Sequence, residues 1–365
     1  MKMKPRSPKA KSKKSAMKSQ RAKNNRTLTL NEEEIPALRS KLLTDADLRA
    51  AAIPGAETSP KLGGANSGLD DSAKCGGVSA DTIKNKIINA DLFAALPLLP
   101  DAFADLIIID PPYNLSKNFG GLKFAGRSDA AYDEYLDSWF PAVCKKLKAN
   151  GSLYICGDWK CSSALQRAVD KELSVMNRIT WQREKGRGAK SNWKNAMEDI
   201  WFAVKNPDDY YFDVEAVMQK RKVLAPYTQD GKPKDWERAA AGNFRRTHPS
   251  NFWDDISVPF WSMPENTDHP TQKPEKLCAK LILASCPKGG IVFDPFLGSG
   301  TSAVAAKKLG RAFCGIEINQ EYCLWAQKRL ERAEGDPSIQ GYSDGVFWER
   351  NTLAAMMNGC KPKNI

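Results

Sequence analysis

Short, continuously apolar runs alternate along the chain with segments that have helical periodicity. The run Leu106–Ile109 is apolar at every position and is followed by Asp110. Strands that are buried on both faces, as in a parallel sheet, have this pattern. Residues 132–147 carry large apolar side chains at four-residue spacing, which predicts a helix that Gly151 would end. This alternation predicts a mostly parallel sheet with helices on both faces.

The alternation extends from about residue 82 to residue 332. The expected strands are 86–89, 106–110, 152–156, 176–182, 199–205, 291–293 and 313–318. The other expected helices are 162–173, 274–286, 302–309 and 321–332. The sequence therefore predicts an α/β fold with a mostly parallel, seven-stranded sheet.

Composition changes sharply before this region. Residues 1–26 contain eight lysines, three arginines and no acidic residue, so they carry +11 of the net charge of +12. Such a basic tail is typical of a disordered, solvated arm and equally of an arm that tethers DNA through its phosphates, and both interpretations stay open. Residues 27–81 are expected to hold a short helix within 32–52, followed by a flexible linker rich in Gly, Ser, Ala and Asp.

The folded region is expected to begin near Thr82 and to be interrupted once. Residues 206–268 are rich in Pro, Trp and Arg and have no clear period. Loops of this length in a compact fold are usually functional. The chain thus divides into a first half at 82–205, the interrupting region, a second half at 269–335 and a C-terminal tail at 336–365.

Composition excludes several classes of protein. No apolar stretch approaches the roughly 20 residues that cross a membrane, and the basic N-terminus lacks the apolar segment of a secretion signal. The nine cysteines form no CxxC pair and the chain has only two histidines, so no metal site is expected. We therefore expect a cytoplasmic protein with reduced thiols and no membrane partner.

A glycine-rich turn links one expected strand to the helix that follows it. Gly298 and Gly300 allow a sharp turn and a close approach to a ligand. Asp294 ends the strand, where a carboxylate can meet an ammonium group, and Glu317 ends the next strand, where an acid can accept from ribose hydroxyls. The third glycine of the dinucleotide motif is absent, which favours a smaller adenosyl ligand over NAD(P). A purely structural turn is the alternative.

The acidic loop Asp110-Pro111-Pro112-Tyr113 follows the continuous apolar strand. Its prolines stiffen the loop and supply no N–H, so the loop offers acceptors and no donors. A carboxylate together with one carbonyl would suit an exocyclic amino group, which has two N–H donors, and the tyrosine can stack on a ring. The loop therefore predicts a site for a flat, amino-bearing base, and a capped strand end is the alternative.

Four segments taken together resemble the β group of DNA amino-methyltransferases. They are DPPY at 110–113, FLGSGT at 296–301, Asn89-Ala90-Asp91 and HPTQKP at 269–274. The resemblance covers roughly residues 82–332. The DPPY segment comes before the FLGSGT segment, and the interrupting region lies between these two motifs. It implies a Rossmann-like fold with a circularly permuted motif order. Its parts are a catalytic half at 82–205, a target-recognition region at 206–268 and a cofactor-binding half at 269–335.

The resemblance also implies S-adenosylmethionine as the cofactor. Its binding residues would be Asp91, Asp110, Lys273, Asp294, Phe296, Gly298, Ser299, Gly300, Thr301 and Glu317. Among these, Asp91 would lie near the adenine, Glu317 would bind the ribose hydroxyls and Lys273 would lie close to the methionine carboxylate. The catalytic residues would be Asp110, Pro111, Pro112 and Tyr113.

In this family DPPY is associated with N6 of adenine and SPPY with N4 of cytosine, so Asp110 favours adenine. The implied activity is site-specific methylation of adenine N6 in double-stranded DNA, by base flipping and direct transfer, within a restriction-modification system. Cytosine-N4 methylation is the alternative, and the motif order argues against an RNA or protein methyltransferase. The implied location is cytoplasmic and associated with the nucleoid. The sequence leaves open whether a cognate restriction endonuclease exists and whether the protein is a homodimer.

Target recognition is expected from basic and aromatic side chains of the interrupting region. The basic candidates are Lys220, Arg221, Lys222, Lys232, Lys234, Arg238, Arg245 and Arg246, and the aromatic candidates are Tyr227, Trp236, Phe244, Trp253 and Trp261. A second basic run, expected on the same face, contains Arg183, Lys185, Arg187, Lys190 and Lys194. As a set they predict DNA contact, although each alone is typical of a solvated charge.

Overall fold

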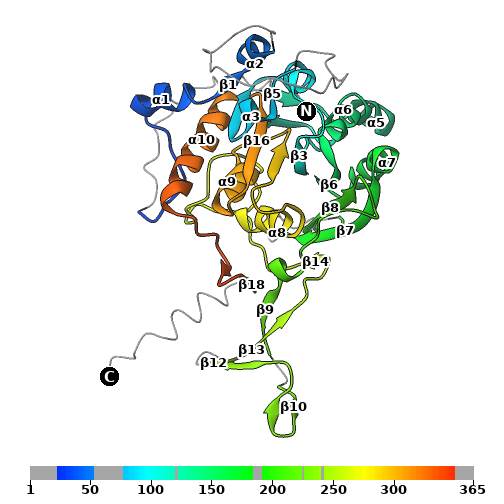
Figure 1. The fold of residues 1–365 in the computed structure, drawn as a ribbon, viewed down its shortest axis with the longest axis vertical. Helices are drawn as coiled ribbons and strands as arrows, with labels where there is room; N and C mark the ends of the chain where they lie inside the picture. The colour runs from blue at the N-terminus through cyan, green and yellow to red at the C-terminus, as the bar shows by residue number, and fades with distance from the viewer. Residues whose placement is uncertain are drawn as a thin grey trace, which may run out of the picture.

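The computed structural model describes residues 23–52, 77–119, 122–183, 191–223, 226–239 and 242–349. These residues form an α/β body from which a narrow β arm projects (Figure 1). None of the helices among them is both long and apolar enough to span a lipid bilayer. The basic tail up to residue 22 and most of the expected linker, residues 53–76, lie outside the described residues.

The body is built on one sheet, which has nine strands within the described residues. Their order across the sheet is β1 (Leu43–Thr44), β2 (Lys86–Asn89), β16 (Ala312–Glu317), β15 (Ile291–Asp294), β3 (Ala104–Ile109), β6 (Leu147–Gly157), β8 (Met197–Val204), β7 (Ser174–Gln182) and β14 (Phe252–Trp253). The strands from β2 to β6 in this order are parallel, whereas β8 runs antiparallel to both of its neighbours. The predicted mostly parallel, Rossmann-like sheet is confirmed, and the two-residue strands β1 and β14 extend its edges.

Helices cover both faces of the sheet, which explains why β3 is apolar at every one of its last four positions. On one face lie α4 (Leu92–Ala95), α5 (Asp129–Asp137), α6 (Phe140–Lys145) and α7 (Ser162–Glu172), and on the other lie α1 (Ile35–Arg39), α8 (Glu275–Ser285), α9 (Thr301–Lys308) and α10 (Gln320–Gly335). Ile107 and Ile109 pack in the first layer, whereas Leu106 and Ile108 pack in the second. Successive side chains of a strand point to opposite faces, so both faces require apolar residues.

The helix expected at 132–147 is two helices, and the strand after it begins earlier than expected. α5 ends at Asp137, and α6 carries Pro141 in its first turn. Proline lacks the N–H that a continuous helix would need there, so a new helix starts instead. β6 begins at Leu147, and Gly151 lies inside the strand, where an added Cβ would come within 2.6 Å of the Leu147 side chain.

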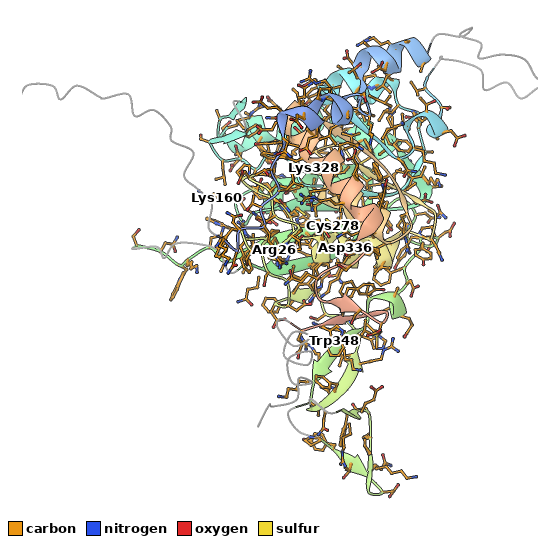
Figure 2. The ribbon with its side chains drawn as sticks, turned by 90° about the vertical axis from the view of Figure 1, so that its left-hand side faces the viewer. Arg26, Lys160, Cys278, Lys328, Asp336 and Trp348 are labelled. Carbon is orange, nitrogen blue, oxygen red and sulfur yellow. The ribbon has the colours of Figure 1, made fainter. Side chains whose placement is uncertain are left out.

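Residues 27–52 pack onto the body, so the prediction that the fold begins near Thr82 is wrong. The single helix expected within 32–52 is replaced by η1 (Glu32–Glu34), α1, β1 and α2 (Asp45–Ala51). Lys328 of α10 binds this segment to the body (Figure 2). Its ammonium pairs with Glu34 and donates to the Thr29 carbonyl at 2.8 Å. The short elements that complete the body are α3 (Ala80–Ile83), η2 (Leu96–Leu98), β4 (Lys117–Phe119), β5 (Leu122–Phe124) and η3 (Glu215–Val217).

Residues 219–247 of the interrupting region form most of the projecting arm, and two strands from the C-terminal segment, β17 and β18, complete it. The main sheet of the arm has the order β12 (Glu237–Ala239), β13 (Gly242–Thr247), β9 (Gln219–Lys222), β18 (Val346–Trp348) and β17 (Tyr342–Ser343), and β10 (Thr228–Gln229) and β11 (Lys232–Pro233) form a separate hairpin. Because β18 pairs in parallel with β9, the expected tail from residue 336 onward contains a strand of this sheet. The side chains of Val346, Phe347 and Trp348 are buried, and Trp348 lies where the arm meets the body (Figure 2). Their burial fixes β18 in place.

Candidate active site

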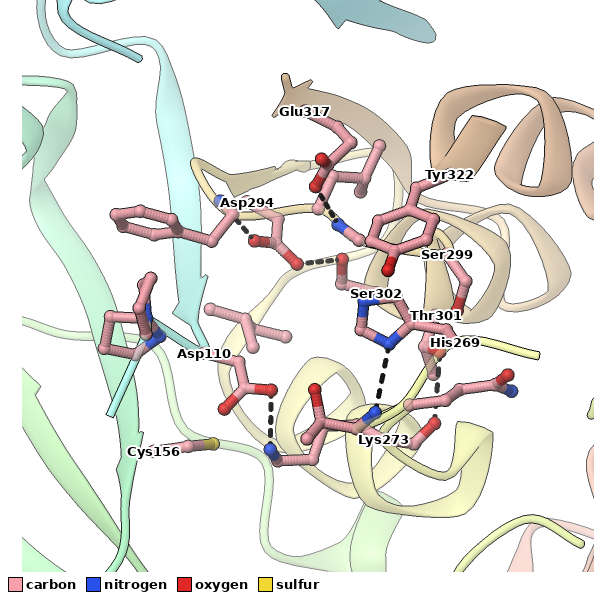
Figure 3. Close-up of a pocket in the computed structure, with 18 of the residues that line it drawn as sticks. Asp110, Cys156, His269, Lys273, Asp294, Ser299, Thr301, Ser302, Glu317 and Tyr322 are labelled. Carbon is pink, nitrogen blue, oxygen red and sulfur yellow. Dashed lines mark hydrogen bonds and ion pairs between the residues drawn. The ribbon is translucent and has the colours of Figure 1, made fainter. Parts of the chain in front are cut away.

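The two loops predicted from the sequence meet at the carboxyl edge of the sheet. β3 and β15 are parallel neighbours, with Ile107 paired to Phe293, so Asp110 and Asp294 lie at the same edge. Ligands of open α/β sheets bind outside the carboxyl ends of the strands. A cavity of about 370 Å³ lies between the loops (Figure 3). Every predicted site residue except Gly300 lines it, namely Asp91, Asp110, Pro111, Pro112, Tyr113, Lys273, Asp294, Phe296, Gly298, Ser299, Thr301 and Glu317.

Two positions of the glycine-rich turn require glycine. Gly298 and Gly300 have φ angles of +55° and +80°, in the left-handed region that other residues rarely adopt. A Cβ at Gly298 would come 3.1 Å from His269 Nε2, and a Cβ at Gly300 would come 2.5 Å from Ala326 Cβ of α10. Gly300 therefore packs the turn against α10, which explains why it does not line the cavity.

The glycine-rich turn is also bound by Arg329, a buried cation of α10 that was not predicted from the sequence. Its Nη1 donates to the Ser299 carbonyl at 2.7 Å and to Thr301 Oγ1 at 3.0 Å, and its Nη2 donates to Glu275 at 2.9 Å. A guanidinium buried in this way is stable only with such partners. The turn is consequently tied to both α8 and α10 before any ligand enters.

Asp294 and Glu317 present carboxylates to one side of the cavity. Asp294 accepts from Phe296 N at 3.0 Å and from the Ser302 hydroxyl, and its burial raises its pKa to about 7. Glu317 accepts from Gly298 N at 2.8 Å and from a second backbone N–H, and burial raises its pKa as well. These bonds orient both acids and leave lone pairs for a ligand.

Asp91, predicted near the adenine, and Phe296, predicted beside the methionine and ribose portions of the cofactor, both line the cavity. Asp91 lines the cavity while its Oδ1 caps α4, accepting from Phe93 N at 2.9 Å. Phe296 packs edge-on against Trp139, with ring centroids 4.9 Å apart. Both side chains are therefore held in place by the surrounding body.

On the other side of the cavity, Asp110 of the acidic loop forms an ion pair with Lys273 (Figure 3). Lys273 Nζ lies 2.6 Å from Asp110 Oδ2, the Tyr113 hydroxyl donates to Asp110 Oδ1 at 2.8 Å, and Lys273 donates to Tyr113 at 3.1 Å. Burial disfavours the charged ammonium of Lys273, but the carboxylates of Asp110 and Glu198 outweigh it and raise the lysine pKa. Burial also raises the pKa of Tyr113, so its hydroxyl stays protonated. Lys273, predicted beside the cofactor's carboxylate, is thus paired with the acid of the other loop.

Two backbone carbonyls of the acidic loop differ in their hydrogen bonds. The Pro112 carbonyl accepts from the Tyr132 hydroxyl at 3.2 Å. Within the described part of the chain, no hydrogen bond to the Pro111 carbonyl is found. Asn114 holds the chain beyond the loop, because its amide bonds to the Arg127 backbone at 2.7 and 2.9 Å.

Glu198 belongs to this cluster and was missed in the sequence. Its side chain is only 4% exposed, and its Oε2 lies 3.4 Å from Lys273 Nζ and 3.3 Å from the Tyr113 hydroxyl. Its Oε1 is bound by Arg183. Glu198 stands at the amino end of β8, which is antiparallel, so this end lies at the same edge as the carboxyl ends of the parallel strands. The pair Glu198-Asp199 before a continuous apolar run was the available signal.

The interrupting region exposes basic side chains and buries most of its aromatic candidates. Trp236, Phe244 and Trp253 are buried, so of the five aromatic candidates only Tyr227 and Trp261 are exposed. Several of the basic candidates pair with acids, namely Lys220 with Glu237, Arg221 with Glu349 and Asp254, and Arg245 with Asp235. No ion pair is found for Lys222, Lys232, Lys234 or Arg246 in the described ranges, and all four side chains are exposed. Most of the second basic run lies outside these ranges.

The chain belongs to the DNA methylase family, whose N6/N4 methyltransferase pattern it matches over residues 104–328. A DNA adenine methyltransferase from Escherichia coli, YhdJ, is 35% identical over 256 residues, which cover 68% of this chain and 83% of the relative. The Type II methyltransferase M.HpaI from Haemophilus parainfluenzae is 32% identical over 252 residues, which cover 67% of this chain and 74% of the relative.

A solved structure shows the same fold. The PvuII DNA methyltransferase, described as cytosine-N4-specific, superposes with a TM-score of 0.50 at 18% sequence identity, covering 67% of this chain and 86% of its own. At this identity the likeness concerns the fold alone. It agrees with the Rossmann-like sheet described above.

Proposed function

We propose that the protein is a site-specific DNA methyltransferase that transfers a methyl group from S-adenosylmethionine to N6 of adenine in double-stranded DNA. The observation that carries this proposal is the meeting, in one cavity, of a glycine-rich turn with two carboxylates and an acidic loop that offers acceptors. The names of the relatives from Escherichia coli and Haemophilus parainfluenzae support it.

The residues of the cavity fit the cofactor. Gly298 lines the cavity with bare backbone, since a Cβ there would crowd His269 Nε2 at 3.1 Å, and the two carboxylates offer acceptors to an ammonium group and to hydroxyls. In this proposal Asp294 binds the ammonium group, Glu317 binds the ribose hydroxyls and Asp91 lies beside the adenine. Phe296 lies along the methionine and ribose portions. Ser299 and Thr301 shape the turn around them. When bound, the cofactor supplies an electrophilic methyl group.

The acidic loop would bind the target amine. Asp110 and the Pro111 carbonyl accept the two N6 hydrogens, which turns the nitrogen lone pair out of conjugation with the ring. Tyr113 stacks on the base, which has to leave the duplex to reach the cavity. Positioning supplies most of the rate acceleration of methyl transfer, because the loops that hold the amino group and the cofactor follow neighbouring parallel strands, β3 and β15. Cytosine-N4 transfer is less favoured, since Asp110 stands where the family's cytosine enzymes usually carry serine.

The arm would provide most of the contact with DNA. Its exposed Lys222, Lys232, Lys234 and Arg246 can neutralise phosphates, and the basic residues 1–26 would add salt-dependent affinity. Binding to DNA would place the protein at the nucleoid. A cognate restriction endonuclease is the partner that the name of the Haemophilus parainfluenzae relative suggests, and a homodimer is a further proposal.

Transfer of labelled methyl groups to unmethylated duplex DNA tests the proposal. Asp110→Asn should lower turnover by roughly 100-fold or more, because it removes the charged acceptor, and should leave cofactor affinity within about twofold. Asp137→Asn is the matched control, since it removes an exposed carboxylate that pairs with Lys171 at 2.7 Å on α7. Normal turnover by the Asp110 variant, or transfer to RNA or protein in place of DNA, would refute the proposal.

A further inference from the structure

Side chains of the protein already engage the acceptor that the target amine needs. Both oxygens of Asp110 are engaged, Oδ1 by the Tyr113 hydroxyl at 2.8 Å and Oδ2 by Lys273 Nζ at 2.6 Å. The contact with Lys273 is a charge-assisted bond, which is shorter and stronger than a neutral one. The ammonium also stands where an N–H donor of the base would have to lie, and its charge opposes the positive charge that develops on the nitrogen during methyl transfer.

Lys273 cannot simply leave, because it is nearly buried. Its side chain is 10% exposed, and a buried ammonium without a carboxylate partner is strongly disfavoured. Lys273 can move away from Asp110 only if a second acid receives it within the same pocket.

Glu198 is that second acid. Its Oε2 lies 3.4 Å from Lys273 Nζ, so the ammonium already stands between two carboxylates and is closer to one of them. A second cavity of about 260 Å³, lined by both Glu198 and Lys273, adjoins this contact and leaves space for the shift. Arg183 binds the other oxygen of Glu198, which aims Oε2 at the lysine. Glu198 itself does not line the main cavity, so it acts on the base through the side chains it contacts, Lys273 and the Tyr113 hydroxyl at 3.3 Å.

We propose that Glu198 is a positioning residue that takes over the Lys273 ammonium when the target base enters, and so frees Asp110 to accept the amino group. This inference rests on the proposed role of Asp110. Exchange of the lysine between two acids keeps the charge of the pocket constant, with the Lys273 and Arg183 cations balancing the Asp110 and Glu198 carboxylates throughout. The Asp110–Lys273 pair thus blocks the acceptor oxygen of Asp110 until the amino group of a base displaces the lysine.

Glu198→Gln tests the inference, because it keeps the shape of the side chain and removes its charge. Lys273 should then stay on Asp110, and kcat should fall by at least about tenfold, while KM for DNA and the cofactor dissociation constant change by less than about twofold. Glu198→Asp, which restores the charge at a longer distance, should recover part of kcat. Glu334→Gln is the matched control, since it removes the same charge from the exposed Lys307–Glu334 pair.

Melting temperature and calorimetric cofactor binding are measured on each variant. A kcat within about twofold of wild type for Glu198→Gln, or a loss of kcat accompanied by lost cofactor binding and a lower melting temperature, overturns the inference. Asp110→Asn is assayed beside it. If that variant is inactive while Glu198→Gln is fully active, only the role of Glu198 is wrong, whereas an active Asp110→Asn enzyme contradicts the proposed function itself.

Discussion

The site predicts that cofactor binding depends on pH through Asp294. Burial raises the pKa of this carboxyl to about 7. The protonated form cannot pair with the ammonium group of S-adenosylmethionine, so binding selects the ionised form. Cofactor affinity should therefore rise as the pH rises through 7 and level off above it.

The size of the effect follows from the fraction of Asp294 that is ionised. For a pKa of about 7, roughly one tenth of the molecules carry the ionised form at pH 6.0 and roughly three quarters at pH 7.5. The dissociation constant at pH 6.0 should then be about eight times that at pH 7.5, a difference of about 1.2 kcal/mol.

Calorimetric titration with S-adenosylmethionine at constant ionic strength measures this ratio. Asp294→Asn should bind the cofactor more weakly, with a much smaller change over the same range. Glu317, whose pKa burial also raises, remains in both proteins and sets the residual slope. A wild-type dissociation constant that is the same at both pH values would refute the assignment of Asp294 to the ammonium group.

Two further predictions concern the glycine-rich turn and the arm. Gly300→Ala should destabilise the protein by about 1–3 kcal/mol more than Gly289→Ala in thermal melting. Both glycines have similar positive φ angles, but only a Cβ at Gly300 would come within 2.5 Å of α10. Equal losses of stability would show that the turn does not need this close packing. Replacing Lys222 and Arg246 together by alanine should lower the slope of log affinity for DNA against log salt by about 2. Lys41→Ala, which removes a cation paired with Glu331 on the body, should leave that slope unchanged, and an unaltered slope in the double variant would remove the arm from the DNA interface.

Much of the sheet and both loops could be predicted because their signals are local. A strand buried on both faces must be apolar throughout, as in Leu106–Ile109, and a turn with two left-handed positions favours glycines such as Gly298 and Gly300. The ends of the helices followed less directly from the pattern, since Pro141 divides one helical pattern into two helices. Local patterns therefore located the cavity.

The partners of the site residues could not be predicted, because they depend on how distant segments meet. Glu198 reaches the cavity only because β8 is antiparallel, and nothing in an apolar run indicates the direction of a strand. Lys273 was assigned from its motif to the cofactor, but its pairing with Asp110 spans 163 positions of the chain. β18 joins the arm through a parallel pairing with β9, more than a hundred residues earlier in the sequence. These pairings decide the electrostatics of the site.

Mapping the modified bases made by this protein tests the central claim most directly. The protein would be expressed in a host that lacks DNA methylation, and its genomic DNA would be read by single-molecule sequencing. We expect N6-methyladenine at nearly every copy of one short sequence, and none in cells that express Asp110→Asn. N4-methylcytosine at such a sequence, or unmodified DNA in cells that contain the folded wild-type protein, would contradict the account.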